Sequence, residues 1–117
     1  MRLASLLFAF LLTLTVAPLA ADARSDAKKQ VEFGIAVSQR GLWREAIYRW
    51  ERAAEIDPTY AAAYNNLAIA YEHEGELEKA RTAYEKALSL EPDNTFIKQN
   101  YELFREINDR TSRTNNL

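Results

Sequence analysis

The chain has 117 residues, with 15 basic and 17 acidic side chains and a net charge of −2 at pH 7. Acidic and basic residues are interspersed, so no continuous basic stripe is available to follow a phosphate backbone, and we expect no nucleic-acid partner. Cysteine is absent, which excludes disulfides, thiol chemistry and thiolate metal sites. The fold must therefore be stabilised by packing alone.

The amino end has the pattern of a secretory signal peptide. Arg2 precedes an uncharged, mainly apolar run over residues 3–17, and an Ala-Asp-Ala tripeptide ends at Ala23. Small residues at this spacing mark a cleavage site, so residues 1–23 are predicted to be a signal peptide that is cleaved after Ala23, with cleavage after Ala20 or Ala21 as the near alternatives. The other interpretation is an uncleaved membrane anchor, because the apolar run approaches the length that spans a thin bilayer. The protein is thus predicted to be exported, either periplasmic or secreted, or else membrane-anchored.

The middle of the chain repeats itself. Residues 61–94 reproduce the pattern of residues 27–60 at an offset of 34 residues, and the match is closest where residues 50–58 align with residues 84–92. A period of this size is characteristic of solenoids built from one supersecondary unit per repeat.

Each copy is predicted to be a helix, a tight turn and a second helix. Gly41 and Gly75 separate the two apolar-periodic stretches, where a left-handed residue ends the first helix. Pro58 and Pro92 are placed to end the second helices. The small residues predicted at the helix contacts are Gly34, Ala46, Ala53, Ala68, Ala80 and Ala87, with Trp50 and Tyr84 filling the space beside them.

The spacing of these residues resembles the motif of the tetratricopeptide repeat (TPR) family. The first copy departs from that motif at Gln30, where an aromatic residue belongs, and at Val37, where Tyr belongs, which is expected to loosen its first helix, residues 26–39. The resemblance implies an all-α fold, a short α-solenoid of two helical hairpins with a carboxyl-terminal capping helix. The second copy matches at every signature position, namely Tyr64, Leu67, Ala68, Tyr71, Ala80, Tyr84, Ala87 and Pro92.

A single helix is predicted after the second copy, over residues 95–110. Side-chain oxygens at residues 93–95 can cap its start. One face, with Ile97, Tyr101, Phe104 and Ile107, is expected to pack on the preceding helix, and the opposite face, with Lys98, Glu102 and Arg105, is expected to meet water and end the stack. Residues 111–117 are polar apart from the last and are predicted to be a disordered tail.

Two hairpins are fewer than a solenoid usually needs for stability. The first helix has no preceding repeat to cover its outer side. We therefore expect the amino-terminal edge to be stabilised by self-association, as a homo-oligomer, or by a protein partner.

The resemblance implies that the first helices of successive repeats line a concave groove that binds other proteins. An apolar strip bordered by polar groups commonly marks a protein-binding site. The alternative is that Phe96 and Leu103 fold against Asn65 and Ile69 as ordinary packing between repeats. The residues predicted to bind a partner in this groove are Lys28, Val31, Ile35, Asn65, Asn66, Ile69, Glu72, Phe96 and Leu103.

Some members of the family hold a peptide's terminal carboxylate with Lys and Asn side chains. Only Asn66 matches that set, because Val31 and Ile35 replace the first Lys and Asn, and Phe96 and Asn100 stand at the third-repeat positions. A carboxylate clamp is therefore not expected. The adjacent Asn pair, residues 65 and 66, could still bond to an extended peptide backbone or could be purely structural.

Catalysis and metal binding have little support in the sequence. His73 is the only histidine, and its acidic neighbours Glu72, Glu74 and Glu76 radiate around a helix and do not converge. We predict a solvated His73, with a minor metal or catalytic role as the weaker alternative, and no cofactor. The predicted function is a non-enzymatic protein-binding module, and the alternative is a membrane-anchored scaffold acting through an uncleaved amino-terminal segment and self-association.

Overall fold

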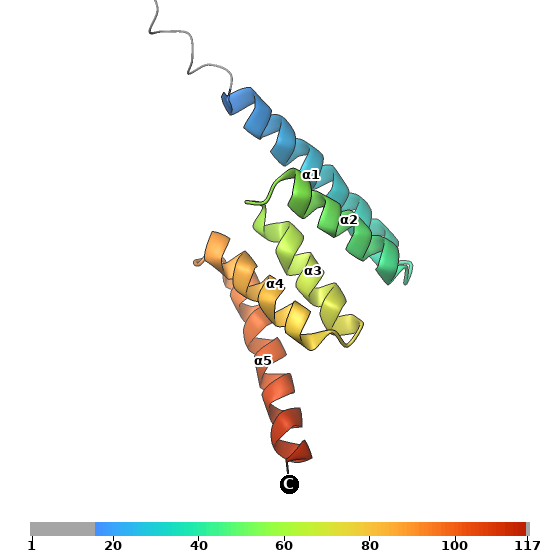
Figure 1. Cartoon of the computed structure of the whole chain (residues 1–117), viewed down its shortest axis with the longest axis vertical. Coiled ribbons are helices and arrows are strands. Elements are labelled where there is room, and N and C mark those ends of the chain that lie inside the picture. Colours follow the sequence, from blue (N-terminus) through green and yellow to red (C-terminus); the bar gives the residue numbers. More distant parts are fainter. Residues whose placement is uncertain (1–15, 117) are drawn as a thin grey trace, which may run out of the picture.

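A computed structural model describes residues 16–116, with side chains from Leu19 onward, and over that range it contains five α-helices and no strand. The helices are α1 (Val16–Ser38), α2 (Trp43–Ile56), α3 (Ala61–His73), α4 (Leu77–Leu90) and α5 (Thr95–Asn115). The α1–α2 pair and the α3–α4 pair each form a hairpin, the second hairpin packs on α2, and α5 packs on α4 (Figure 1). The predicted all-α short solenoid is confirmed.

Glycine reverses the chain inside each hairpin. Gly41 has φ of 79° and Gly75 has φ of 77°, both in the left-handed region that other residues rarely adopt. The N–H groups of Leu42 and Glu76, one residue later, donate to the carbonyls of Val37 and Tyr71 at 3.1 and 2.8 Å. Both turns therefore have the geometry predicted for them.

The second helix of each hairpin ends just before a proline. Asp57 and Glu91 leave the helical conformation, and their N–H groups donate to the carbonyls of Ala53 and Ala87. Pro58 and Pro92 follow directly. At the start of α5, the side chain of Asn94 accepts from the N–H groups of Phe96 and Ile97, both at 3.1 Å, as the predicted N-cap requires.

The core lies between the helices of each hairpin and at the junction between them. Trp50 and Tyr84 are 2% and 1% exposed, and the five alanines predicted at helix contacts are fully buried. The Trp50 indole N–H donates to the carbonyl of Val31 at 3.1 Å, which satisfies its polar atom inside the core. Each large side chain buried in this way stabilises the fold by about 1.5–3 kcal/mol.

A hydrogen bond from a tyrosine to a glutamate joins each junction along the stack, although the two tyrosines occupy different repeat positions. The Tyr71 hydroxyl of α3 donates to Glu51 of α2 at 2.9 Å, and the Tyr101 hydroxyl of α5 donates to Glu85 of α4 at 2.9 Å. Glu51 and Glu85 occupy equivalent repeat positions. Burial, together with the neighbouring carboxylate, raises the pKa of Tyr71, so this hydroxyl stays protonated and able to donate.

Helix α1 begins earlier than predicted. It starts at Val16 and runs unbroken to Ser38, extending past the end of α2 (Figure 1). Residues 16–23 of the predicted signal, including Ala21 and Ala23 of the cleavage site, therefore lie in a helix, while residues 1–15 are outside the described residues. Among the helices described, none has the length and apolar character needed to cross a bilayer.

The predicted disordered tail is wrong for residues 111–115, which continue α5. Polar composition suggested disorder, but these side chains bond to their own helix. The hydroxyls of Thr111, Ser112 and Thr114 each donate to the carbonyl four residues earlier at 3.0–3.1 Å.

Candidate functional site

Helices α1, α3 and α5 lie side by side along one face of the stack. Helix α1 contacts α3, and the Asn100 amide of α5 donates to the Asn65 side chain of α3 at 3.2 Å. Ile35, Ile69 and Leu103 recur at the 34-residue offset, so they take the same position on these three helices. We call Ile35, Ile69, Phe96 and Leu103 the apolar row.

The apolar row is accessible at its two ends. Phe96 and Leu103 of α5 are 63% and 57% exposed, and Ile35 of α1 is 38% exposed. Ile69, in the middle, is half-buried and packs partly against the core. The alternative that Phe96 and Leu103 are consumed by packing between repeats is therefore wrong, because α5 meets α3 through the Asn100–Asn65 hydrogen bond.

Two residues predicted to contact a partner are buried. Val31 is 4% exposed, because its side chain belongs to the core and its carbonyl accepts from Trp50. Asn65 is also 4% exposed, because α5 covers it. Neither side chain can reach a ligand in this arrangement, so both are removed from the candidate site.

The other predicted polar contacts are largely occupied within the protein. The Asn66 amide donates to the carbonyl of Ala62 at 2.9 Å, and Glu72 accepts from the Tyr84 hydroxyl at 3.0 Å. Lys28 is exposed on α1. The accessible part of the candidate site is thus mainly apolar.

His73 stacks on a tryptophan that sequence reasoning had not singled out. The rings of His73 and Trp43 lie 4.1 Å apart at an angle of 20°, joining the end of α3 to the start of α2. At the 34-residue offset, Trp43 corresponds to Leu77 and His73 corresponds to Ile107, and both of these residues are apolar. A comparison of the two copies could therefore have indicated that Trp43 and His73 are in contact. Over the described residues, no group of three or more His, Asp or Glu side chains could hold a metal ion.

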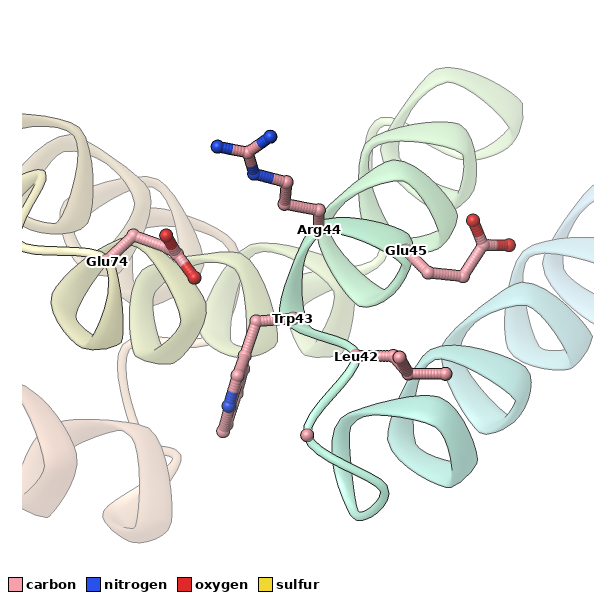
Figure 2. Close-up of a pocket in the computed structure, with 6 residues that line it drawn as sticks. Leu42, Trp43, Arg44, Glu45 and Glu74 are labelled. Carbon is pink, nitrogen blue, oxygen red and sulfur yellow. The ribbon is translucent and has the colours of Figure 1, made fainter.

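A pocket of about 280 Å³ lies beside the turn that precedes α2. Figure 2 shows that the side chains of Trp43, Arg44 and Glu45 point in different directions around it. Nucleophile, base and oxyanion donors have to converge for catalysis, and this geometry does not bring such groups together. The pocket lining is Gly41, Leu42, Trp43, Arg44, Glu45 and Glu74.

Arg24 ties α1 to the loop between the hairpins. Its Nε lies 2.5 Å from Asp57 Oδ2, its Nη2 donates to the Thr59 hydroxyl at 3.1 Å, and its guanidinium lies 4.7 Å from the ring centre of Tyr60. Asp57 also accepts from the N–H and hydroxyl of Thr59 at 3.0 and 2.6 Å. Burial alone would raise the pKa of Asp57, but the hydrogen bonds from Thr59 and Arg24 outweigh it, and the pKa is lowered.

Two protein-family models match the chain. One, described as a tetratricopeptide repeat, covers residues 61–94, and the other, described as a TPR repeat, covers residues 36–75. Together they span residues 36–94, half of the chain and most of the two hairpins.

Curated relatives share the repeat region. The type IV pilus assembly protein PilF of Pseudomonas aeruginosa is 33% identical over 86 residues, which are 72% of this chain and 34% of that protein. The chloroplastic tetratricopeptide repeat domain-containing protein PYG7 of Arabidopsis thaliana is 34% identical over 61 residues, 52% of this chain and 20% of that protein. The chain spans about a third or less of the length of these relatives.

A solved structure confirms the architecture. The TPR domain of Arabidopsis OM64 superposes with a TM-score of 0.68 and covers 75% of this chain and 73% of that chain. Sequence identity is 20%, so the likeness concerns the fold alone.

Proposed function

Since two tetratricopeptide repeat models match residues 36–94, the chain belongs to the tetratricopeptide repeat family, and we propose that its groove binds a segment of another protein. Repeats of this kind are generally non-catalytic interaction modules. The binding surface is the apolar row on α1, α3 and α5, and the bound segment is an amphipathic helix or an extended peptide with apolar anchors.

The exposure of the apolar row carries the proposal. Phe96 and Leu103 are more than half exposed on a helix whose adjacent side is buried through Ile97 and Phe104. Apolar side chains left out of the internal packing gain about 25 cal/mol for each Å² that a partner removes from water. Ile35 extends the same surface to α1, so a ligand could contact both ends of the stack.

Recognition by this groove does not need a terminal carboxylate. Ile35 stands where a carboxylate-gripping residue belongs, and the Asn66 amide already bonds to Ala62. Anchors spaced at i, i+3 or i+4 and i+7 on a partner helix would fit an apolar strip of this kind.

Affinity capture with the full chain and two matched variants tests the proposal. The groove variant carries Ile35→Ser, Phe96→Ser and Leu103→Ser, and the control variant carries Leu42→Ser and Leu77→Ser, which remove similarly exposed apolar side chains elsewhere. Helicity and thermal midpoint are compared first, to establish that both variants fold. We expect partners retained by the control and lost by the groove variant, and partners that survive in the groove variant would exclude the apolar row.

We infer export from the amino-terminal pattern of a charged start, an apolar run and small residues. A second candidate is a membrane-anchored scaffold. The observation that favours it is the unbroken run of α1 through Ala21 and Ala23, because a helix continuous with the first hairpin would hold the repeats in a fixed orientation at the bilayer. The mass of the native amino terminus separates the two, since it begins near Arg24 in the exported form and retains the apolar run in the anchored form.

A further inference from the structure

Helix α1 leaves exposed the side that the later first helices bury. In α5 this side holds Ile97 and Phe104, which are 2% and 1% exposed, and Tyr101, whose ring lies 5.6 Å from that of Tyr84 in α4. Two repeat offsets earlier, the same positions of α1 are Lys29, Phe33 and Ala36, all exposed. The corresponding side of α1 is therefore not covered by any helix among the described residues.

The neighbouring helix α2 adds an aromatic and cationic platform to this surface. The Arg49 guanidinium lies 4.3 Å from the ring centre of Phe33 and 5.5 Å from that of Tyr48, and its Nε is 2.9 Å from Glu45. Phe33 and Tyr48 are about half exposed. The second hairpin has Thr82 and Ala83 in place of Tyr48 and Arg49, so the platform belongs to the first hairpin alone. We call Lys29, Phe33, Ala36, Tyr48 and Arg49 the amino edge.

The charge of the first hairpin indicates what covers the amino edge. Residues 24–56 carry seven basic and five acidic side chains, whereas residues 57–94 carry three basic and eight acidic ones. Lys29 of α1 and Arg49 of α2 lie on the amino edge itself, each beside one carboxylate, Asp26 or Glu45, and Arg40 is exposed in the turn that follows α1. Like charges across an interface cost free energy, so the surface favours an acidic partner.

A second copy of the chain does not fit this requirement. Two amino edges facing each other would place basic side chains opposite basic side chains. Docking through the outer side of α5 would present Lys98, Glu102 and Arg105, and α5 as a whole carries four basic and three acidic residues. Neither arrangement supplies an acidic apolar helix.

We propose that the amino edge binds an acidic amphipathic helix of another protein, which takes against α1 the place that α4 takes against α5. Within the stack, Glu85 of α4 accepts from the Tyr101 hydroxyl of α5. Phe33 replaces Tyr101 at the amino edge, so a carboxylate of the incoming helix would pair with Lys29 or Arg40. Phe33 and Tyr48 would supply the apolar contact.

A synthetic helix tests the proposal directly. The probe is a peptide with the sequence of α4, residues 77–90, made acidic by Lys79→Glu and Lys86→Glu and held helical by a staple between positions 78 and 82, on its exposed side. It is titrated into the ¹⁵N-labelled full chain while backbone amide shifts are followed. We expect shifts over residues 29–40 and at Arg49, and weaker binding when the ionic strength rises from about 0.05 M to about 0.5 M.

Matched variants test whether the basic side chains contribute to binding and whether the peptide binds at the amino edge. Lys29→Glu with Arg40→Glu should weaken binding about tenfold, the effect of roughly 1.4 kcal/mol, whereas Lys98→Glu with Arg105→Glu on α5 should leave it unchanged. Equal affinity for a peptide in which the acidic residues are replaced by Lys, shifts confined to α5, or no shifts at all would overturn the proposal. We expect the groove variant to bind the probe as tightly as the unmodified chain does. The proposal for the amino edge and the proposal for the apolar row can therefore be refuted separately.

The natural occupant can be identified by a photo-crosslinking amino acid at Ala36, which is exposed in the middle of the amino edge. A crosslink to an acidic helical segment of another protein, lost in the Lys29→Glu and Arg40→Glu variant, supports the proposal. Crosslinks only between two copies of the chain, or only to lipid, would contradict it.

Discussion

The indole ring of Trp50 lies so close to the backbone of Gly34 that a Cβ atom at residue 34 would come within 2.7 Å of ring carbons Cδ1 and Cε2. The second hairpin holds the equivalent pair as Ala68 and Tyr84, both buried. The larger ring is thus paired with glycine and the smaller ring with alanine. Each hairpin fills the same space with a different division of volume.

Gly34→Ala is expected to destabilise the protein, although alanine is the better helix former. Overpacking typically costs about 1–3 kcal/mol, and the gain in helix propensity is at most about 1 kcal/mol. Adding Trp50→Tyr in the same chain recreates the pair of the second hairpin and should restore part of the loss. Urea denaturation followed by circular dichroism measures both, and a double variant less stable than Gly34→Ala would refute the volume argument.

Gln30→Tyr is expected to stabilise the first hairpin by about 1 kcal/mol, because a buried polar atom without a partner carries a desolvation cost of that order. The Gln30 Oε1 atom is buried and has no hydrogen-bond partner among residues 16–116. The equivalent residue, Tyr64, lies beneath the ammonium group of Lys86, and Arg52 is the counterpart of Lys86 in the first hairpin. Thermal unfolding compares this variant with Glu32→Tyr, which adds the same ring at an exposed position of α1 and should give no gain.

Asp57→Asn is expected to lower the free energy of unfolding most at neutral pH. The pKa of Asp57 is lower in the folded protein than in the unfolded chain, so the carboxylate contributes stability that is complete above the unfolded value, near 4, and is lost as the pH falls through the folded value. The difference between the two proteins should therefore narrow as the pH falls below about 4. A difference in the free energy of unfolding that is independent of pH would show that ionisation of Asp57 does not stabilise the fold. Arg24→Ala should lower the free energy of unfolding by only about 0–1 kcal/mol, because Arg24 is half-exposed.

His73→Ala is expected to cost about 0.5–1.5 kcal/mol through loss of the stack with Trp43, beyond the loss of buried area. A double-mutant cycle with Trp43→Ala isolates the pairwise contribution. Glu74→Ala is the control, because that carboxylate lies 3.8 Å from the imidazole without sharing the stack. Strictly additive effects of His73→Ala and Trp43→Ala would mean that the rings only happen to be adjacent.

The repeat determined which parts of the fold could be predicted. Gly41, Gly75, Trp50 and Tyr84 recur at a fixed offset, so their roles at turns and in the core followed from the comparison of one copy with the other. Arg24 lies outside the repeat, in a stretch where the cleavage pattern dominated the interpretation. Its partner Asp57 is 33 residues away, and no local pattern marks that contact.

The candidate site was predicted less well, since repeat position alone does not determine exposure. Asn65 was expected in the groove, but its burial depends on Asn100 of α5, a pairing between two different repeat positions. Val31 belongs to the core cluster, and its carbonyl accepts from the Trp50 indole, a contact that its repeat position did not reveal. Ile35, Phe96 and Leu103 are exposed as expected, and their role in binding stays a prediction.

Helix α5 is fixed to the stack by two fully buried side chains, Ile97 and Phe104, by the rings around Tyr101 and by one amide bond to α3. It also carries Phe96 and Leu103, half of the apolar row. The most exposed side chains of the apolar row thus lie on a helix that packs mainly on a single neighbour, α4, among the described residues. Because Phe96 and Leu103 lie on α5, any rotation of α5 about its capped start at Asn94 would change the width of the proposed binding surface.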